Sequence, residues 1–330
     1  MLCGRLPSHA RQRGRGEAVS AHFAETSSKI TGYLIGAVKR VVPASAQPGA
    51  NRLFDKTTNG VERALGWRED LTPPLRIRLH IGPFADPRLY RLAGDANVEG
   101  FRDLAGLRPG SSFLDIACGC GRVARALTSY LGPGATYEGF DTAVKPVAWA
   151  QSVITAKFPS FHFRTADTFN KRYNPQGKTG ASELIFPYED GTFDFAFAGS
   201  LYTHMVPDEV ANFVAETKRV LKPGGKTLAT FCLLSERTLP LVDAGKTMPR
   251  LVYRYGDCRV RTEKDPAHFI AHPESWVRDL YAKVGLRIVE PIERGTWAES
   301  TPESKALEKY HLGGSPSKSA SQDAVIAVKA

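Results

Sequence analysis

After Gly110 the sequence alternates short apolar runs with amphipathic helical patterns, and this alternation constrains the fold more than any other feature. An apolar run between turn residues predicts a buried strand, and strands that alternate with helices predict βαβ units and a parallel sheet. We therefore expect an α/β fold. The predicted strands cover residues 112–117, 135–140, 161–165, 193–198, 226–232, 286–289 and 324–328, and the predicted helices cover 123–131, 144–158, 208–221 and 275–284.

The composition divides the chain into three regions. Residues 1–50 are expected to form a basic, partly disordered leader with one amphipathic helix at about 28–42. Residues 51–108 are predicted to form a helical cap region, and residues 109–330 contain the alternating strands and helices. An insertion at about 233–273, rich in Arg and Tyr, is predicted to form a lid.

The charge of the leader allows three interpretations. Residues 1–50 contain seven basic and two acidic residues, so they carry half of the net charge of +10. We expect a solvated tail, and the alternative is a contact with an anionic membrane surface or with nucleic acid. The Arg-rich, acid-poor composition is also typical of a mitochondrial targeting segment.

The cysteine count and the apolar pattern bear on the compartment and on metal binding. Five cysteines are an odd number in a long chain, which favours a reducing compartment, and we expect a cytoplasmic protein. No run of 18 apolar residues occurs, and Arg11, Arg13 and Arg15 lie where a signal peptide would be apolar. Since Cys118 and Cys120 have no second Cys or His pair at zinc-site spacing, no metal site is expected.

The most informative segment is a small-residue turn between the first strand and its helix. The strand ends at residues 115–117, and a small-residue turn follows as far as Gly121, in the pattern Asp-x-Ala-x-Gly-x-Gly that begins at Asp115. Glycines there allow backbone N–H groups to approach a ligand at the helix N-terminus. An acid in the turn would repel a pyrophosphate, so it suits a ligand with a positive group, such as an ammonium or a sulfonium.

Two further acids end the next predicted strands. Asp141 lies 20 residues after Gly121 and could accept hydrogen bonds from ribose hydroxyls. Asp167 ends the third strand and could accept from an exocyclic adenine amine. Residues 200–205 follow the fourth predicted strand and should lie at the same edge of the sheet.

These motifs, together with residues 186–200 and 220–225, resemble in order those of the class I S-adenosylmethionine (SAM)-dependent methyltransferases. The resemblance implies a Rossmann-like, doubly wound seven-stranded sheet, mostly parallel with an antiparallel last strand, and SAM as the cofactor. It implies that Asp115 and the turn backbone face the methionine moiety, that Asp141 holds the ribose, and that Asp167 and Thr168 flank the adenine. The residues assigned to the cofactor are Asp115, Ala117, Cys118, Gly119, Gly121, Asp141, Asp167, Thr168 and Ser200.

The sequence departs from the family pattern at Ala117, where Gly is usual. The methyl group of alanine is small, and alanine is tolerated in the turn if its φ stays negative. Cys118 and Cys120 are predicted to be small loop residues rather than nucleophiles.

Two residues after the fourth strand are candidates for catalysis. His204 lies where the sulfonium methyl should point and could act as a general base; the alternative is a structural hydrogen bond at a helix start. Tyr202 could line the methyl site or pack into the core. Tyr253, Tyr255 and Trp276 could be aromatic residues of the substrate pocket or ordinary packing residues.

We expect a SAM-dependent methyltransferase that acts on a small-molecule acceptor at oxygen. A nucleic-acid partner is disfavoured because strand four ends in Ala-Gly-Ser-Leu-Tyr rather than in Asn/Asp-Pro-Pro-aromatic. The alternatives are an RNA or protein methyltransferase, a non-catalytic SAM-binding protein and a nicotinamide oxidoreductase. The sequence predicts no particular oligomeric state.

Overall fold

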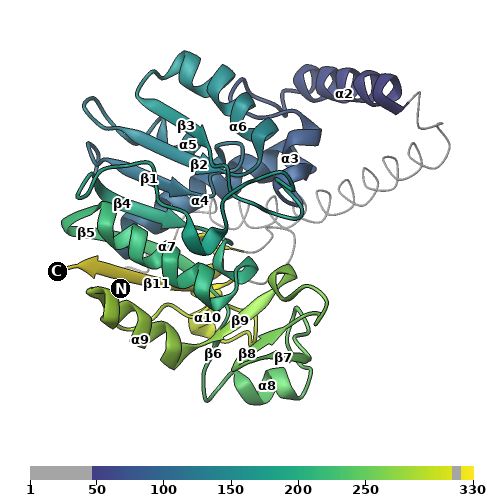
Figure 1. Ribbon diagram of the computed structural model, residues 1–330. Helices are drawn as coiled ribbons and strands as arrows, with labels where there is room; N and C mark the ends of the chain where they lie inside the picture. Colours follow the sequence, from purple (N-terminus) through teal and green to yellow (C-terminus); the bar gives the residue numbers. More distant parts are fainter. Residues whose placement is uncertain (1–46, 314–320) are drawn as a thin grey trace, which may run out of the picture. The chain divides into compact units, whose positions relative to one another are not determined.

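The computed structural model describes residues 47–313 and 321–330 (Figure 1). The helix predicted near residues 28–42 lies outside the described residues. The chain forms two compact units, residues 1–90 and 91–330, and each is described by itself. Within the described ranges, none of the helices has the length and apolar composition that crossing a bilayer requires.

The described residues of the first unit, from 47 onward, are mainly helical. It contains α2 (Gln47–Ala64), α3 (Leu75–Ile81) and the first residues of α4 (Pro87–Ala105). A buried ion pair joins α2 to α3, because the Arg78 guanidinium contacts the Glu62 carboxylate at 2.5 Å. The same guanidinium donates to the carbonyls of Pro73, Phe84 and Ala85, so its buried charge has several partners.

The second unit is built on a seven-stranded sheet of order β10-β11-β5-β4-β1-β2-β3. β11 runs antiparallel to both of its neighbours, β5 and β10, and the remaining pairs are parallel. This arrangement confirms the predicted sheet, with its antiparallel last strand. The strands are β1 (Phe113–Ile116), β2 (Tyr137–Asp141), β3 (Phe161–Thr165), β4 (Phe193–Ala198), β5 (Leu221–Phe231), β10 (Leu286–Ile288) and β11 (Asp323–Lys329).

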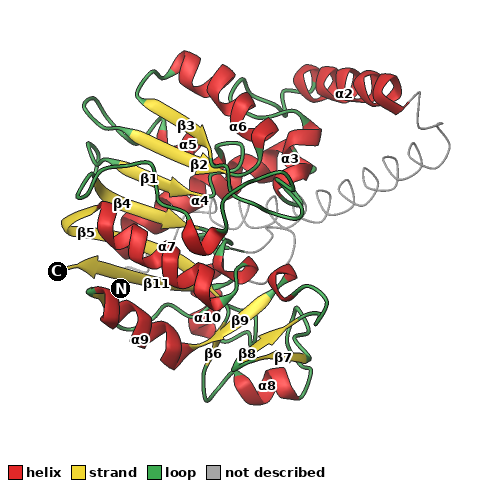
Figure 2. Ribbon diagram, in the orientation of Figure 1, coloured by secondary structure: helices red, strands yellow, loops and turns green. Residues whose placement is uncertain are grey.

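Helices cover both faces of this sheet, and alternate residues of the central strands point to opposite sides. On one face, Phe101 of α4 packs against Phe113, Phe195 and Phe197. On the other face, side chains such as Leu114 form a core with α7 (Pro207–Val220) and α9 (Glu274–Val284), which lie together in Figure 2. The other helices are α5 (Arg122–Leu127), α6 (Val144–Ala150, continued by a π-helical turn, Gln151–Thr155), α8 (Leu239–Asp243) and α10 (Pro302–Glu308).

The predicted lid insertion forms a second, smaller sheet of order β6-β9-β8-β7. Its strands are β6 (Leu233–Leu234), β7 (Tyr253–Tyr255), β8 (Cys258–Val260) and β9 (Ile270–Pro273). The 3₁₀ turn Pro266–His268 precedes β9 and contacts the 3₁₀ turn Tyr202–His204 after β4. The insertion therefore reaches the edge of the main sheet at which β4 ends.

Candidate active site

The strand order brings the predicted cofactor residues to one edge of the sheet. β4, β1, β2 and β3 are parallel neighbours, so their carboxyl ends meet. β1 lies between β4 and β2, where the chain reverses the direction in which it adds strands, and α/β proteins bind ligands at such points. Asp115, Asp141 and Ser200 lie at or just after the ends of β1, β2 and β4.

The turn after β1 has a left-handed backbone at three positions. The φ angles are +63° at Ala117, +57° at Gly119 and +76° at Gly121. Ala117 therefore does not meet the condition of a negative φ, because the chain must bend sharply out of β1, and this conformation costs an alanine about 1–2 kcal/mol. At Gly121 a Cβ atom would lie 2.7 Å from Cδ1 of Ile154, so the π-helical turn after α6 packs too closely against Gly121 for a side chain.

The thiol of Cys118 points away from this edge. It is buried against Gly139 of β2, where an added Cβ would lie 2.9 Å from Cβ of Cys118. Burial, together with the charges of Asp115 and Asp141, raises the pKa of the Cys118 thiol well above its ordinary value. A thiol of this kind is inert, so only the backbone of Cys118 is available to a ligand.

Asp141 ties the turn to the end of β2. Its Oδ2 accepts a hydrogen bond from the Gly119 N–H at 2.8 Å, and its Oδ1 accepts one from the Ala143 N–H at 2.8 Å. Each carboxylate oxygen can accept more than one hydrogen bond, so this carboxylate could still receive hydroxyl groups of a ligand.

Asp115 is a buried carboxyl group beside the turn. Its Oδ2 accepts a hydrogen bond from the Tyr137 hydroxyl at 2.7 Å. Burial raises the pKa of Asp115 to about 7, although the Tyr137 hydrogen bond and the positive charge of Arg122 act in the opposite direction. Because desolvation disfavours the charged form, a ligand cation at this position would favour ionisation of the acid.

Arg122 is held by a chain of contacts that sequence reasoning missed. Its guanidinium donates to Oδ1 of Asn97 at 2.6 Å. Asn97 in turn donates to the carbonyls of Tyr310 and His311, which lie more than 200 residues away in the sequence. No local signal in the sequence could reveal a link over that separation.

Asp167 and Thr168 follow β3 and differ in burial. The Asp167 side chain is exposed, while its carbonyl accepts hydrogen bonds from the N–H groups of Lys178 and Thr179. The Thr168 side chain is buried, and its Oγ1 has no hydrogen-bond partner among the described residues. A buried hydroxyl without a partner costs about 1–3 kcal/mol, so Thr168 is suited to a polar group of a ligand.

Ser200, two residues after the end of β4, has a φ of +54°. Its N–H donates to Oγ1 of Thr230 on β5 at 2.7 Å. Of the three non-glycine residues with positive φ in the described ranges, Ala117 and Ser200 both follow strand ends at this edge. Unfavourable backbone conformations of this kind cluster at ligand sites.

The two predicted catalytic residues lie in the same 3₁₀ turn but in different surroundings. The Tyr202 side chain is 1% exposed and its ring centroid lies 4.9 Å from that of Phe231, so Tyr202 packs into the core. His204 is partly open to solvent, its Nδ1 lies 3.4 Å from the Ala267 carbonyl, and its ring meets that of Phe269 edge-on.

The electrostatics around His204 favour the neutral imidazole. Burial of part of its ring lowers its pKa below the ordinary value, as do the positive charges of His268 and Arg172, while two backbone hydrogen bonds act in the opposite direction. A neutral imidazole can accept a proton, which a general base must do.

His272 on β9 is a buried residue that sequence reasoning missed. Its Nε2 donates to the Tyr202 carbonyl at 3.0 Å, and its ring stacks on that of Trp276. Burial lowers the pKa of His272 to about 4, so it stays neutral. The stacking supports the packing alternative for Trp276, whereas Tyr253 and Tyr255 on β7 are each 42% exposed.

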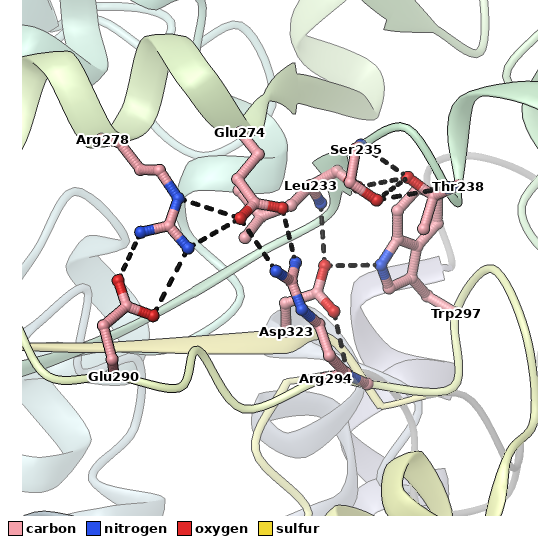
Figure 3. Close-up of polar contacts among 10 residues, drawn as sticks. Leu233, Ser235, Thr238, Glu274, Arg278, Glu290, Arg294, Trp297 and Asp323 are labelled. Atoms are coloured by element: carbon pink, nitrogen blue, oxygen red, sulfur yellow. Dashed lines mark hydrogen bonds and ion pairs between the residues drawn. The ribbon is translucent and has the colours of Figure 1, made fainter.

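A cavity of about 620 Å³ lies elsewhere in the second unit, beside β6, α9 and α10. Three charged residues of its lining form ion pairs, because Glu274 contacts both Arg278 and Arg294, and Arg278 also contacts Glu290 outside the lining (Figure 3). None of the cofactor residues predicted from the sequence lines this cavity. Across the described part of the chain, His, Cys, Asp and Glu side chains form no group of three or more that could hold a metal ion.

A known protein family matches the part of the sequence that forms this edge of the sheet. Residues 114–229 match a family described as a methyltransferase domain. These residues run from β1 into β5, and they include every predicted cofactor and catalytic residue.

Curated relatives match parts of the chain. A demethylmenaquinone methyltransferase of Shouchella clausii is 30% identical over 196 residues, which are 56% of this chain and 73% of the relative. A 2-phytyl-1,4-naphtoquinone methyltransferase of Trichormus variabilis is 28% identical over 37% of this chain and 46% of its own length. A demethylmenaquinone methyltransferase of Halalkalibacterium halodurans is 33% identical over 41% of this chain and 48% of the relative. The chain thus spans about half the length of the last two relatives.

Solved structures also align with the chain. A SAM-dependent methyltransferase from Methanosarcina mazei is 21% identical with a TM-score of 0.43, over 68% of this chain and 94% of that one. Another aligned structure is a 1,6-didemethyltoxoflavin-N1-methyltransferase from Burkholderia thailandensis with 1,6-didemethyltoxoflavin and S-adenosylhomocysteine bound. It is 17% identical with a TM-score of 0.43, over 72% of this chain and 79% of that one.

Proposed function

The chain belongs to the class I SAM-dependent methyltransferases, and from this premise we propose that it methylates a small, ring-bearing acceptor at a hydroxyl oxygen. The single observation that carries the choice of oxygen is the position of His204. This residue has a lowered pKa, lies in the turn that follows Ser200 at the end of β4, and contacts the insertion through the Ala267 carbonyl.

SAM is the methyl donor of this family, and when bound it supplies an electrophilic methyl group on a sulfonium. The residues at the sheet edge fit such a ligand. Asp115 offers a buried acid to the ammonium, the carboxylate of Asp141 offers acceptors to ribose hydroxyls, and the buried Thr168 hydroxyl offers an unused hydrogen bond. Cys118, Gly119, Gly121 and Ser200 would contribute their backbone.

The chain's own task in the reaction is to orient the acceptor and to remove one proton. Most of the rate enhancement in methyl transfer comes from in-line positioning and the exclusion of water. A hydroxyl acceptor must also lose its proton, and neutral His204 would take that proton on its imidazole nitrogen. Tyr202, which is buried, would support the turn rather than touch the acceptor.

The class of acceptor is inferred from the insertion and from the relatives. Tyr253, Arg254 and Tyr255 of β7 are exposed, and such a combination suits a planar or anionic molecule. The curated relatives named above are methyltransferases of naphthoquinone and menaquinone compounds. We therefore place aromatic hydroxyl compounds first among the acceptors.

Two measurements on the full chain test this function. Calorimetry with SAM and S-adenosylhomocysteine, and NADH as the control ligand, should give micromolar binding of the two adenosyl ligands alone. A panel of phenols and hydroxyquinones, incubated with methyl-labelled SAM, should then give a product labelled at oxygen. Labelling at nitrogen or carbon would contradict the oxygen assignment, and binding of NADH alone would contradict the whole proposal.

A further inference from the structure

We propose that Thr230 and Gln322 are positioning residues, which fix the loop after β4 through a buried chain of hydrogen bonds. This inference rests on the proposed function, because it assumes that Ser200 contacts the cofactor and that His204 acts on the acceptor. Neither Thr230 nor Gln322 belongs to a motif that the sequence analysis used. Both lie on the β5–β11 side of the sheet, away from the glycine turn.

The chain of hydrogen bonds has a defined direction. The Ser200 N–H donates to Oγ1 of Thr230 at 2.7 Å, and the Thr230 hydroxyl donates to Oε1 of Gln322 at 2.6 Å. The Gln322 amide nitrogen then donates to Oγ1 of Thr203 at 3.4 Å. Because the single hydroxyl proton of Thr230 is committed to Gln322, its lone pairs stay directed at Ser200.

The packing around Gln322 leaves its side chain little freedom. A Cβ atom on Gly313 would lie 2.4 Å from Oε1 of Gln322, and one on Gly295 would lie 2.4 Å from its backbone carbon. Two glycines from separate segments thus make room for this one residue. Gln322 is 4% exposed and Thr230 is fully buried, so water does not replace their hydrogen bonds.

The neighbouring residue anchors this end of β11. The Asp323 carboxylate accepts hydrogen bonds from the Leu233 N–H at 2.9 Å, the Gly295 N–H at 2.9 Å and Nε1 of Trp297 at 2.7 Å (Figure 3). These donors come from β6 and from the segment before α10. Successive residues of an extended chain point to opposite sides, so Asp323 faces its three donors while Gln322 faces the loop after β4.

The loop after β4 is therefore held at three points. Thr230 binds the backbone of Ser200, Gln322 binds the side chain of Thr203, and His272 binds the carbonyl of Tyr202. The first contact supports the positive φ of Ser200, and the other two fix the 3₁₀ turn that carries His204. Loss of the Thr230 acceptor would leave the Ser200 N–H without this partner and allow the loop to relax.

A matched pair of substitutions at Thr230 tests the inference on the full chain. Thr230→Val keeps the shape of the side chain but removes the hydroxyl, and Thr230→Ser keeps the hydroxyl. We expect Thr230→Val to raise the dissociation constant for SAM about tenfold, the loss that corresponds to about 1.4 kcal/mol for one buried hydrogen bond. Thr230→Ser should stay within about twofold of the wild type, measured by calorimetry.

Thr227→Val is the control for a general effect of removing a buried hydroxyl from β5. Thr227 lies on the same strand, three residues before Thr230, and is also buried. Its substitution should lower the melting temperature without changing the affinity for SAM. Gln322→Met provides a second variant in case Thr230→Val does not fold, and it should weaken SAM binding and also lower kcat through the turn of His204.

The outcomes separate this inference from the proposed function. If the wild type binds SAM and Thr230→Val and Gln322→Met bind it equally tightly, the positioning role is refuted while the proposed function stands. A loss in Thr230→Ser as large as that in Thr230→Val would also refute it, because the hydroxyl would then be irrelevant. If the wild type binds neither adenosyl ligand, the proposed function fails first, and the inference fails with it.

Discussion

Replacing Asp115 by Asn should separate the stability of the protein from its affinity for SAM. The pKa of this buried acid rises from 3.8 to about 7. Each pH unit between those values corresponds to about 1.4 kcal/mol, so the ionised carboxylate costs the folded state on the order of 4 kcal/mol at pH 8. Because the folded-state pKa is raised, the contribution of Asp115 to stability is fully present below about pH 4 and is lost as the pH rises through 7.

Asp115→Asn removes this titration but keeps an oxygen that can accept the Tyr137 hydroxyl. The variant should gain free energy of unfolding relative to the wild type as the pH rises, by about 2–3 kcal/mol between pH 5 and pH 8. Its affinity for SAM should fall at least about tenfold, because the ammonium loses its counter-charge. A gain in stability with a loss of binding is the expected trade-off at a ligand site.

Urea unfolding of both proteins at several pH values measures the effect. The informative quantity is the difference between variant and wild type, since other titrating groups are present in both proteins and cancel. One such group is Asp323, whose pKa burial raises to about 6. If the difference in free energy of unfolding between variant and wild type does not change with pH, the reasoning is refuted. Such a result would show that ionisation of Asp115 does not destabilise the folded protein.

Three more substitutions test the edge of the sheet. Asp141→Ala should weaken SAM binding by about 1–3 kcal/mol in calorimetry, and unchanged binding would rule out the ribose assignment. Ala117→Gly relieves the left-handed conformation at φ +63° and should stabilise the protein to urea by about 0.5–1 kcal/mol, which a loss of stability would contradict. His204→Ala should lower kcat and leave SAM affinity within about twofold. Because the pKa of His204 is lowered, the acid limb of the wild-type kcat profile should lie below pH 6.5 and disappear in the variant.

The main sheet was predictable because its parallel strands are buried on both faces. Such strands appear as continuous apolar runs, and the predicted bounds of β3 and β4 agree with the structure. β5 begins earlier than predicted, at Leu221, because the segment with Gly224 and Gly225 belongs to the strand. The small sheet of the insertion was missed because its strands contain only two to four residues, too few for a periodic pattern.

The acids of the site were predictable because they follow strand ends, and parallel strands bring those ends together. The residues that support them were not. Tyr137 on β2 donates a hydrogen bond to Asp115 on the neighbouring strand β1, and Gln322 donates one to Thr203, 119 residues away in the sequence. The φ of Ala117 also escaped prediction, because the methyl group gives no sign that the turn demands a left-handed backbone.

The position of β11 has a consequence for the order of folding. This strand lies between β5 and β10 in the sheet, although it follows both of them in the chain. A growing or refolding chain can therefore pair β1 to β5 before β11 takes its place. Gln322 arrives only with β11, so the loop after β4 lacks one of its supports until that step. Full affinity for SAM should therefore appear late in refolding, after most of the secondary structure has formed.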